Sequence, residues 1–479
     1  MEYMNKSGAG KAIADKAKIE ELLSRGVDTV YPTRDALRDV LMSGKRIRLY
    51  LGIDPTSPHL HLGHAENIIM LRKFQDLGHE VILLMGDFTG RIGDPTDKLA
   101  ARTQLTDKQV KENLKTFKAQ ASKVLRFTGA NAAQIKFNAK WLGKLTFEEV
   151  IKLASHFTVQ QMLERDMFQK RLNFTYTCPK CGKEQIYAHA TPRTDGGIRS
   201  VEHGSGLTKS RVCTNCGAHN TFEAINNAIL VKKNANESEG IRAPRPIGLH
   251  EFFYPLMQGY DSVAMDVDLE VGGTDQTFNM LAGRTLLKAM KGKEKFVITN
   301  RLLEDPTTGK KMSKTEGTLV NLDDEPNDMF GKIMALPDEL IPHILELSTM
   351  IPIERVTELT SKLKKGENPR DIKLIASEEV VALYHSPKLA KEAREEWVRV
   401  FSHKEKPEDA PKLKLKTHTL SLIDLVLAAG IPSKSEARRL VEQNAVKIND
   451  AVKKDSGEMI TLKPRDIIRI GKHRFFEIA

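Results

Sequence analysis

A strand–turn–helix–strand pattern near the N-terminus constrains the fold more than any other feature of this chain. Hydrophobic and polar residues alternate over residues 46–53, and this period of two predicts a β-strand. Glycine and proline then break the pattern within Gly52-Ile-Asp-Pro-Thr56. An apolar-rich stretch over residues 63–77 predicts a helix that ends at Gly78, and the apolar run 81–85 is typical of a buried strand. Together these segments predict a βαβ unit in an open α/β sheet.

Two short motifs lie where such a sheet binds its ligands. His61-Leu-Gly-His64 opens the predicted helix, and Lys311-Met-Ser-Lys314 lies in a glycine- and threonine-containing loop after another predicted strand. Ligands bind beyond the carboxyl ends of parallel strands, and a helix N-terminus favours anions. Either motif alone can arise by chance. In this context the two together indicate an ATP site where imidazoles and lysines contact the phosphates.

Length and charge restrict the class of protein without deciding it. The 479 residues suffice for roughly two to four domains with a sizeable core. The hydrophobic fraction is 40%, no apolar run of about 18 residues could span a membrane, and residues 1–18 lack the apolar core of a secretory signal. We therefore expect a cytoplasmic protein. The net charge of +11 fits a polyanionic partner such as RNA, and equally a protein that binds none.

The four cysteines of the chain form two C-x-x-C pairs, each followed by glycine. Such turns can direct four thiolates at one ion, as in structural zinc sites. Disulfides are the alternative, which a cytosolic location disfavours, and redox chemistry does not require two matched pairs. We expect structural Zn²⁺, without a catalytic role, at Cys178, Cys181, Cys213 and Cys216.

Five segments, in order, resemble a class I aminoacyl-tRNA synthetase, specifically a bacterial-type tyrosyl-tRNA synthetase. They are residues 52–64, 93–95, 254–261, 271–276 and 311–315. The tryptophan branch shares the ATP motifs, so the resemblance to the tyrosine branch rests on Tyr50, Asp94, Tyr254, Gln258 and Asp261. The resemblance implies a tyrosine–tRNA ligase that activates L-tyrosine with ATP to tyrosyl-adenylate, releasing pyrophosphate. Transfer of tyrosine to the 3′ end of tRNA(Tyr) would follow.

The resemblance also implies which residues bind ATP. Activation is an in-line attack by a carboxylate on the α-phosphate, so positioning and charge stabilisation supply the catalysis. The implied catalytic residues are His61, His64, Lys311, Lys314 and Thr56, and the further ATP-binding residues are Gly63, Gly273, Asp275, Met312, Lys98 and Arg102. For Lys98 and Arg102 a solvated basic surface is the alternative. Mg²⁺ is expected with ATP, held mainly by phosphates and water.

The tyrosine-binding residues implied by the resemblance divide into two groups. Tyr50 and Asp261 read the phenol, which needs a donor and an acceptor in an apolar pocket. The α-ammonium is held by Asp94, Tyr254 and Gln258, while Gln276 faces the tyrosine and its adenylate. A site built to bond a hydroxyl rejects the analogue lacking it by about 10⁴–10⁵-fold, so no editing domain is expected.

An insertion at about residues 173–245 departs from the familiar pattern of the family, and it contains the four cysteines. It falls in the region that forms the subunit interface in this family, whose members are homodimers. The insertion either extends the dimer contact, or touches the acceptor end of the RNA, or is a purely structural ribbon.

The C-terminal third predicts two further domains. Residues 323–400 are helical in pattern and correspond to the part that approaches the anticodon in the family. A polar, proline-containing linker follows at 401–416. Residues 417–479 combine an amphipathic helix, a capping box at Ser433 and short strands around a turn at Asn449, and they resemble an S4 RNA-binding module. Its candidate phosphate contacts are Lys434, Arg438, Arg439, Lys447 and Lys472.

The predicted architecture is therefore α/β. A Rossmann-like parallel-sheet catalytic domain over 1–322 contains a zinc-ribbon insert at 173–245, and a helical domain and a small α+β S4-type domain follow. Three rival functions remain at this point. Tyr50 and Asp261 disfavour a ligase for another aromatic acid. The two ATP motifs disfavour an RNA-binding protein, such as a splicing helper, derived from a synthetase. A zinc-ribbon nucleic-acid adaptor would need neither motif.

Overall fold

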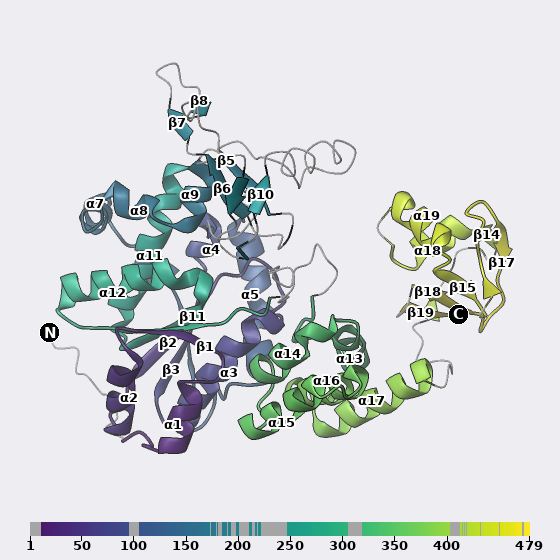
Figure 1. Ribbon diagram of the computed structural model, residues 1–479, viewed down its shortest axis with the longest axis horizontal. Helices are drawn as coiled ribbons and strands as arrows, with labels where there is room; N and C mark the ends of the chain where they lie inside the picture. The colour runs from purple at the N-terminus through teal and green to yellow at the C-terminus, as the bar shows by residue number, and fades with distance from the viewer. Residues whose placement is uncertain are drawn as a thin grey trace. The chain divides into compact units, whose positions relative to one another are not determined.

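The computed structural model (Figure 1) describes residues 11–94, 105–172, 247–304, 319–402 and 474–479, most of 412–471, and short segments between 174 and 221. Its contacts divide the chain into two compact units. The first comprises Met1–Glu325 and Lys332–Pro387, and the second comprises Pro326–Gly331 and Lys388–Ala479.

The first unit is built on a six-stranded sheet with the order β1-β12-β11-β2-β3-β4. The strands from β12 to β4 run parallel, whereas the edge strand β1 is antiparallel to β12. The predicted parallel sheet is thus confirmed for five strands, and the sequence pattern did not reveal β1. The strands are β1 (Val27–Tyr31), β2 (Arg48–Ile53), β3 (Glu80–Met85), β4 (Gln134–Phe137), β11 (Leu269–Gly273) and β12 (Phe296–Asn300).

The predicted βαβ unit is confirmed by β2, α3 (Leu62–Asp76) and β3. β2 and β3 pair in register from Arg48 with Glu80 to Ile53 with Met85. Gly78 has a φ of +88°, the left-handed conformation that ends helices after their last turn. Helix α3 packs on β2, β3 and β11, so its N-terminus lies at the carboxyl edge of the sheet.

Two long helices, α11 (Leu249–Met265) and α12 (Thr277–Lys291), pack along each other beside the sheet (Figure 1). Their close approach requires glycine, because a Cβ on Gly259 would lie 3.1 Å from the backbone nitrogen of Gly283. Helix α12 also contacts β11 and β12. This packing presents α11 side chains to the carboxyl ends of the strands. Helices α1 (Lys16–Leu22) and α2 (Arg34–Met42) precede the sheet core, with α2 next to β1.

Short helices and three antiparallel strand pairs fill the described chain between β3 and α11. The helices are α4 (Thr89–Ile92), α5 (Asp107–Ala121), α6 (Ala139–Leu142), α7 (Phe147–Ala154), α8 (Val159–Leu163) and α9 (Asp166–Leu172). The strand pairs are β5 (Phe174–Thr177) with β6 (Glu184–Ala188), β7 (Ala190–Pro192) with β8 (Ile198–Ser200), and β9 (Ser210–Val212) with β10 (His219–Thr221).

Two contacts between α9 and α11 join the chain on either side of the insertion. Arg171 and Glu251 form a buried ion pair in which Nη2 lies 3.0 Å from Oε1. The Phe168 and Phe252 rings stack with centroids 4.8 Å apart. The two ends of the insertion are therefore held together independently of the residues inside it.

Helices dominate the chain beyond β12. They include α13 (Pro326–Met334), α14 (Ile341–Leu347), α15 (Ile353–Lys364), α16 (Pro369–Tyr384) and α17 (Pro387–Ser402). A short 3₁₀ turn, η3 (Asp338–Leu340), lies between α13 and α14, and another, η1 (Thr274–Gln276), lies between β11 and α12. Buried Arg25 donates to the carbonyls of Leu345 (3.1 Å) and Glu346 (2.8 Å) in the last turn of α14, where carbonyls need partners from outside the helix. The named elements of this region are thus all helical, and α17 continues past the predicted end at residue 400, while a separate helical domain over 323–400 stays a prediction.

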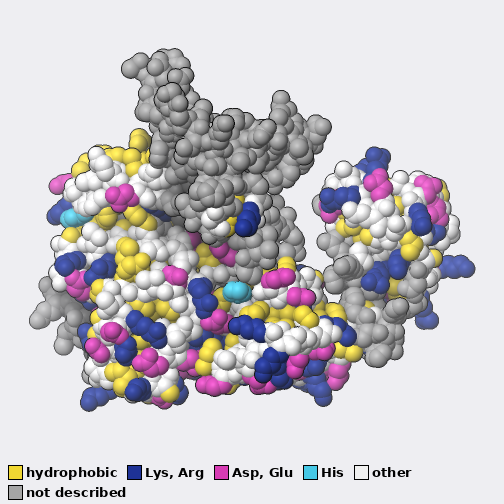
Figure 2. Space-filling view, in the orientation of Figure 1, with side chains coloured by type: hydrophobic (Ala, Val, Ile, Leu, Met, Phe, Trp, Pro, Cys, Tyr) yellow, Lys and Arg dark blue, Asp and Glu magenta, His cyan; other side chains and the backbone are white. Residues whose placement is uncertain are grey.

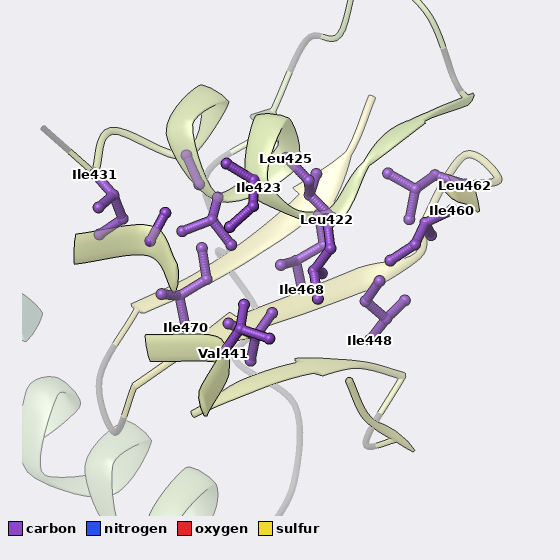
Figure 3. Packing of buried hydrophobic residues seen from close by; sticks show 14 of the residues in the cluster. Leu422, Ile423, Leu425, Ile431, Val441, Ile448, Ile460, Leu462, Ile468 and Ile470 are labelled. Carbon is purple, nitrogen blue, oxygen red and sulfur yellow. The ribbon is translucent and has the colours of Figure 1, made fainter. Parts of the chain in front are cut away.

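The second unit contains a small α+β fold with its own core (Figure 3). Buried aliphatic side chains from both helices and from the strands form one cluster, with Leu422, Leu425 and Ile468 fully buried. Ser421 and Ser433 cap the two helices through their hydroxyl oxygens. The helices are α18 (Leu422–Ala428) and α19 (Lys434–Glu442), and the strands are β13 (Lys412–Leu413), β14 (Thr419–Ser421), β15 (Val446–Ile448), β16 (Ala451–Val452), β17 (Met459–Thr461), β18 (Ile467–Ile470) and β19 (Arg474–Ile478).

Candidate active site

Polar side chains converge beyond the carboxyl ends of β2, β3 and β11, as expected for an open α/β sheet. Asp54, directly after β2, accepts hydrogen bonds from the Tyr254 hydroxyl (2.7 Å) and from Thr89 Oγ1 (2.6 Å). Gly86, directly after β3, allows this arrangement because a Cβ there would lie 1.9 Å from Asp54 Oδ1. Asp54 therefore ties the turn after β2 to α4 and α11.

Tyr50 lies in β2 and is fully buried. Its hydroxyl is 3.0 Å from Ser262 Oγ on α11. Burial, reinforced by the carboxylates of Glu270 and Asp261, raises the pKa of the Tyr50 phenol well above its usual value. The hydroxyl therefore stays protonated and can donate a hydrogen bond.

Asp261, predicted as the partner of Tyr50 at the phenol, is 2% exposed. Its hydrogen-bond partners lie in α6 or directly before that helix. It accepts hydrogen bonds from Trp141 Nε1 (2.7 Å) and Asn138 Nδ2 (3.2 Å). Burial raises the pKa of Asp261 well above its usual value, and the two donors oppose that rise. The structure thus places Asp261 and Tyr50 in one buried polar cluster, each with a partner of its own.

The residues predicted to hold the α-ammonium come from three elements. Tyr254 and Gln258 lie on α11, with the Gln258 amide Nε2 donating to Glu270 Oε1 at 3.1 Å. Asp94 follows α4 and accepts a hydrogen bond from Gln276 Nε2 at 2.7 Å. Burial raises the pKa of Tyr254 well above its usual value, with contributions from the carboxylates of Asp54 and Asp94, so Tyr254 and Asp94 are electrostatically coupled.

Arg165 was not predicted to belong to this site. Its side chain is 2% exposed, and its Nη2 lies 3.7 Å from Asp94 Oδ1. The guanidinium lies over the rings of Phe168 and Phe278, 5.4 and 5.3 Å from their centroids. A buried cation therefore lies next to the carboxylate that the resemblance assigns to the substrate ammonium.

His61 and His64 form the N-terminal cap of α3. His61 Nδ1 accepts from the backbone nitrogen of Gly63 (3.1 Å), and the backbone nitrogen of His61 donates to His64 Nδ1 (3.2 Å). The two rings lie 4.0 Å apart. Burial lowers the pKa of His64 to about 4, so this imidazole is neutral near pH 7. Because Nδ1 accepts, Nε2 holds the proton and can donate to an anion.

Gly63 and Gly273 allow close approaches at this edge. A Cβ on Gly63 would lie 2.9 Å from the His61 ring, and a Cβ on Gly273 would lie 2.7 Å from Asp275 Oδ1. Asp275 is close enough to raise the pKa of His64 slightly against the effect of burial. Thr56, after β2, is exposed. These predicted ATP-binding residues therefore lie after β2, around the N-terminus of α3, or at the end of β11 and in the turn that follows it.

Five predicted ATP-binding residues, Lys98, Arg102, Lys311, Met312 and Lys314, lie outside the described residues. The chain that follows the lysine motif is nevertheless fixed beside the histidine motif. The backbone nitrogen of Leu62 donates to the Val320 carbonyl (3.0 Å), and that of Leu322 donates to the Leu60 carbonyl (2.8 Å). Val320 and Leu322 therefore lie next to the histidine motif.

Of the predicted zinc ligands, Cys178 and Cys216 are described, and Cys181 and Cys213 lie outside the described residues. Cys178 directly follows β5, and Cys216 lies between β9 and β10. Their sulfur atoms are 3.9 Å apart, too far for a disulfide bond. Within the described residues, no group of three or more possible metal ligands is present.

The predicted RNA contacts are spread over the second unit. Lys434, Arg438 and Arg439 are exposed on α19. Lys447 on β15 is half-buried and pairs across the strands with Arg469 on β18. Lys472 lies outside the described residues. Lysine and arginine side chains are visible over much of the surface of this unit in Figure 2.

Sequence comparison then decides the family. The profile described as tRNA synthetases class I (W and Y) matches residues 42–182 and 209–402, and that of the SYY-like C-terminal domain of tyrosine–tRNA ligase matches residues 403–478. The chain belongs to the class I family of tyrosine–tRNA ligases. It is 38% identical to the tyrosine–tRNA ligase of Moorella thermoacetica, over 95% of this chain and 94% of that protein. It is 37% identical to the ligase of Carboxydothermus hydrogenoformans, over 96% of this chain and 97% of that protein.

Solved structures agree on the fold of this synthetase. The C-terminally truncated mitochondrial tyrosyl-tRNA synthetase of Aspergillus nidulans superposes with a TM-score of 0.56 at 20% identity, over 81% of this chain and 95% of that one. The corresponding Coccidioides posadasii enzyme gives 0.53 at 22% identity, over 81% and 92%. None of the described helices of the synthetase is long and apolar enough to cross a membrane.

Several residues of the synthetase site escaped the sequence reasoning. Asn138, Trp141 and Ser262 hold predicted site residues, and Glu270 and Lys295 lie behind them. Glu270 lies next to apolar Val271 in a strand, and this alternation predicts that Glu270 is on an exposed, polar face. Only the burial of both faces of β11 shows otherwise.

Proposed function

We propose that this ligase binds L-tyrosine between the phenol-reading pair, Tyr50 and Asp261, and the ammonium group of residues. The observation that supports this most strongly is the hydrogen-bonded cluster at the carboxyl edge of the sheet. In it the buried, protonated hydroxyl of Tyr50 supplies a donor and the Asp261 carboxylate supplies an acceptor. A phenol requires both, and phenylalanine would leave both unpaired.

The α-ammonium is bound by Asp94, Tyr254 and Gln258 in this proposal. Asp94 supplies negative charge beside buried Arg165, and Tyr254 is positioned through Asp54. Gln276 lies in the same turn as Asp275 and donates to Asp94 at 2.7 Å, so it connects that turn to the ammonium-binding residues. The α-carboxylate is then directed towards the ATP side of the site, where it attacks the α-phosphate and displaces pyrophosphate.

On the phosphate side, His61 and His64 act at the N-terminus of α3. The neutral His64 ring presents its Nε2 proton to a phosphate oxygen, and the helix dipole favours the same negative charge. Lys311, Lys314 and Thr56 contact the same phosphates, Lys98 and Arg102 assist, and Gly63, Gly273, Asp275 and Met312 complete the ATP site. Mg²⁺ arrives bound to the nucleotide.

Tyrosine-dependent ATP–pyrophosphate exchange without RNA tests this assignment. Exchange with tyrosine, but not with phenylalanine or tryptophan, is the expected result. Exchange with another aromatic acid would overturn the roles of Tyr50 and Asp261 while keeping the ligase chemistry. A folded protein without any exchange would favour an RNA-binding descendant of a synthetase.

We further propose that a structural Zn²⁺ is held by Cys178, Cys181, Cys213 and Cys216. Each C-x-x-C lies between the two strands of an antiparallel pair, β5–β6 or β9–β10. Thiolates on one tetrahedral zinc, with Zn–S near 2.3 Å, lie about 3.8 Å apart, close to the 3.9 Å between Cys178 and Cys216. Metal analysis of the purified protein should find about one zinc per chain. A metal-free Cys178→Ser with Cys216→Ser variant is the control, and no zinc in the parent protein would refute the site.

The homodimer remains a proposal supported by an apolar surface. Phe147 and Ile151 on α7 are 80% and 55% exposed, and Leu249 at the start of α11 is 80% exposed. Helix α7 packs against α11, and hydrophobic side chains are visible at the surface around α7 in Figure 2. Exposed apolar area of this kind marks interaction sites. Sedimentation should give twice the chain mass, and Phe147→Asp should halve it. A parent protein that sediments as a monomer would refute the proposal.

The second unit is proposed to bind tRNA(Tyr) as an S4-type domain, predicted over residues 417–479, after a helical domain at 323–400. The linker predicted at 401–416 is too long, because α17 extends to Ser402 and β13 (Lys412–Leu413) pairs with β19 in the sheet of the C-terminal domain. Lys434 and Arg438 are one helical turn apart on α19, and Arg439 is adjacent. Arg438→Ala with Arg439→Ala should weaken tRNA binding and flatten its salt dependence by about two units of slope. An unchanged slope would remove these arginines from the interface. We also propose a cytoplasmic location, where both ATP and tRNA are present.

A further inference from the structure

A fully buried ion pair lies directly behind the proposed tyrosine site. The side chains of Lys295, just before β12, and of Glu270 on β11 are 0% and 2% exposed, and Lys295 Nζ donates to Glu270 Oε2. Burying two charges costs several kcal/mol of desolvation per ion, and replacement by apolar residues of similar volume is often neutral or stabilising. Fold stability therefore gives little reason for this pair, and its other contacts indicate what it does.

One of these contacts determines how the Gln258 amide faces the site. Gln258 Nε2 lies 3.1 Å from Glu270 Oε1. A carboxylate paired with an ammonium only accepts hydrogen bonds, so Gln258 must turn its NH₂ group towards Glu270. The carbonyl oxygen of Gln258 then faces the other way, and a carbonyl oxygen is the end of the amide that accepts from an ammonium.

A second contact restricts how the hydroxyl of Tyr50 can be oriented. Lys295 Nζ lies 2.9 Å from Ser262 Oγ, and an ammonium only donates, so Ser262 accepts from Lys295. The single proton of Ser262 then has two possible acceptors, the Tyr50 oxygen at 3.0 Å, a contact in which either atom can donate, and Glu270 Oε2 at 3.4 Å. When Ser262 donates to Tyr50, the proton of Tyr50 is left for the phenol oxygen of the substrate.

We propose that Glu270 and Lys295 are positioning residues that set the direction of the hydrogen bonds at both ends of bound tyrosine. Through Gln258 they present an acceptor to the α-ammonium, and through Ser262 they leave the Tyr50 hydroxyl as a donor to the phenol. The inference rests on the proposed tyrosine site and adds specificity residues that touch neither the substrate nor ATP.

A charge-neutral double variant, Glu270→Leu with Lys295→Met, tests this inference without leaving a charge unpaired. The matched control is Arg171→Met with Glu251→Leu, which removes a second buried ion pair, at 8% and 9% side-chain exposure, whose residues are not among the proposed tyrosine-binding residues. The probes are L-tyrosine, L-phenylalanine, 3-(4-hydroxyphenyl)propionate, which lacks the ammonium, and ATP. The readouts are exchange kinetics, inhibition by the propionate and thermal unfolding.

The expected result is a KM for tyrosine that rises about 10–100-fold, a KM for ATP within about twofold of the parent, and a smaller preference for tyrosine over phenylalanine. The propionate should inhibit less than before through loss of its phenol contact, and the control pair should change none of these ratios. Should the double variant not fold, Glu270→Gln is the alternative. It keeps the side-chain volume, but either the introduced amide or the Gln258 amide can then donate in their hydrogen bond, and a smaller rise in the KM for tyrosine is expected.

Three outcomes would overturn the inference. An unchanged tyrosine KM in the folded variant would make the pair purely structural. Equal rises for tyrosine and ATP, or an equal effect of the control pair, would indicate a general disturbance of the unit. Failure of the proposed function itself would be distinguishable, because the parent protein would then show no tyrosine-dependent exchange.

Discussion

The two ends of the proposed catalytic site are built differently. At the phenol end, Tyr50 and Asp261 are buried and already hydrogen-bonded to Ser262, Trp141 and Asn138. At the phosphate end, His61 and His64 bond mainly to the backbone and to each other, and Thr56 is exposed. Selection of the amino acid therefore depends on buried side-chain networks, whereas phosphate contact depends on a helix N-terminus.

This difference follows from the chemistry of the two ligands. A phenol is small and neutral, and only a preorganised donor and acceptor distinguish it from a benzene ring. A triphosphate carries several negative charges, so backbone N–H groups, imidazoles and lysines bind it without deep burial. Changes at the phosphate end should therefore affect rate, and changes at the phenol end should affect selectivity.

His64→Ala tests the phosphate end and should have the largest effect. Loss of the Nε2 donor should reduce exchange by about 10²–10³-fold, as for removal of one preorganised oxyanion donor. Tyrosine binding, measured by equilibrium dialysis, should stay within about twofold. His59→Ala is the matched control, since His59 lies in the same segment and bonds Asp323 at 2.8 Å. Equal losses in both variants would mean that the segment, and not the imidazole of His64, matters.

Tyr50→Phe tests the phenol end and should show the opposite signature. The variant removes the donor but keeps the ring in the core with Ile82, Leu84 and Met265. The preference for tyrosine over phenylalanine should fall by about 10–100-fold, while the KM for ATP stays constant. Exchange kinetics with both amino acids measure this ratio. A drop in rate without a change in preference would break the comparison between the two ends.

The same contrast determines what the sequence could predict. The place of the histidine motif at a helix start was predictable because the motif is contiguous, and the βαβ pattern around it is confirmed by β2, α3 and β3. The phenol end was predictable only through family resemblance, which gave Tyr50 and Asp261 but not their partners. Ser262, Glu270 and Lys295 meet only after α11, β11 and β12 pack, and nothing in their local pattern marks them as buried. The antiparallel strand β1 escaped prediction because its short polar-containing pattern at a sheet edge resembles a loop.

Tyr254→Phe sharpens the comparison between the two ends of tyrosine itself. The Tyr254 hydroxyl donates to Asp54 at 2.7 Å, so its loss should remove one donor from the Asp54 carboxylate, which still accepts from Thr89, and loosen the residues around the ammonium. The KM for tyrosine should rise about 5–10-fold, less than the selectivity loss in Tyr50→Phe, because one hydrogen bond near the ammonium contributes about 1 kcal/mol. The preference for tyrosine over phenylalanine should not change. A collapse of that preference would show that the two ends are not independent.

Acidification should produce the smallest effect on activity and a clear one on stability. Burial lowers the pKa of His64 and of His79 to about 4, below the ordinary 6.5. Between about pH 4 and pH 6.5 the unfolded chain binds more protons at these two histidines than the folded chain does. The contribution of His64 and His79 to the free energy of unfolding is therefore complete above about pH 6.5 and is lost as the pH falls to about 4. Burial raises the pKa of Glu66 to about 9, and its contribution runs the other way, complete below the ordinary 4.5 and lost as the pH rises to about 9.

Urea unfolding between pH 4.5 and 7.5 measures how the free energy of unfolding changes as the two histidines titrate. His79→Gln should make this free energy depend less on pH without changing a residue of the proposed active site. Because His64 is already neutral, exchange activity between pH 6 and 8 should show no step near pH 6.5. A step there that His64→Gln abolishes would mean that the imidazole binds phosphate as a cation. The phosphate end would then rely on side-chain charge rather than on a neutral donor at the helix N-terminus.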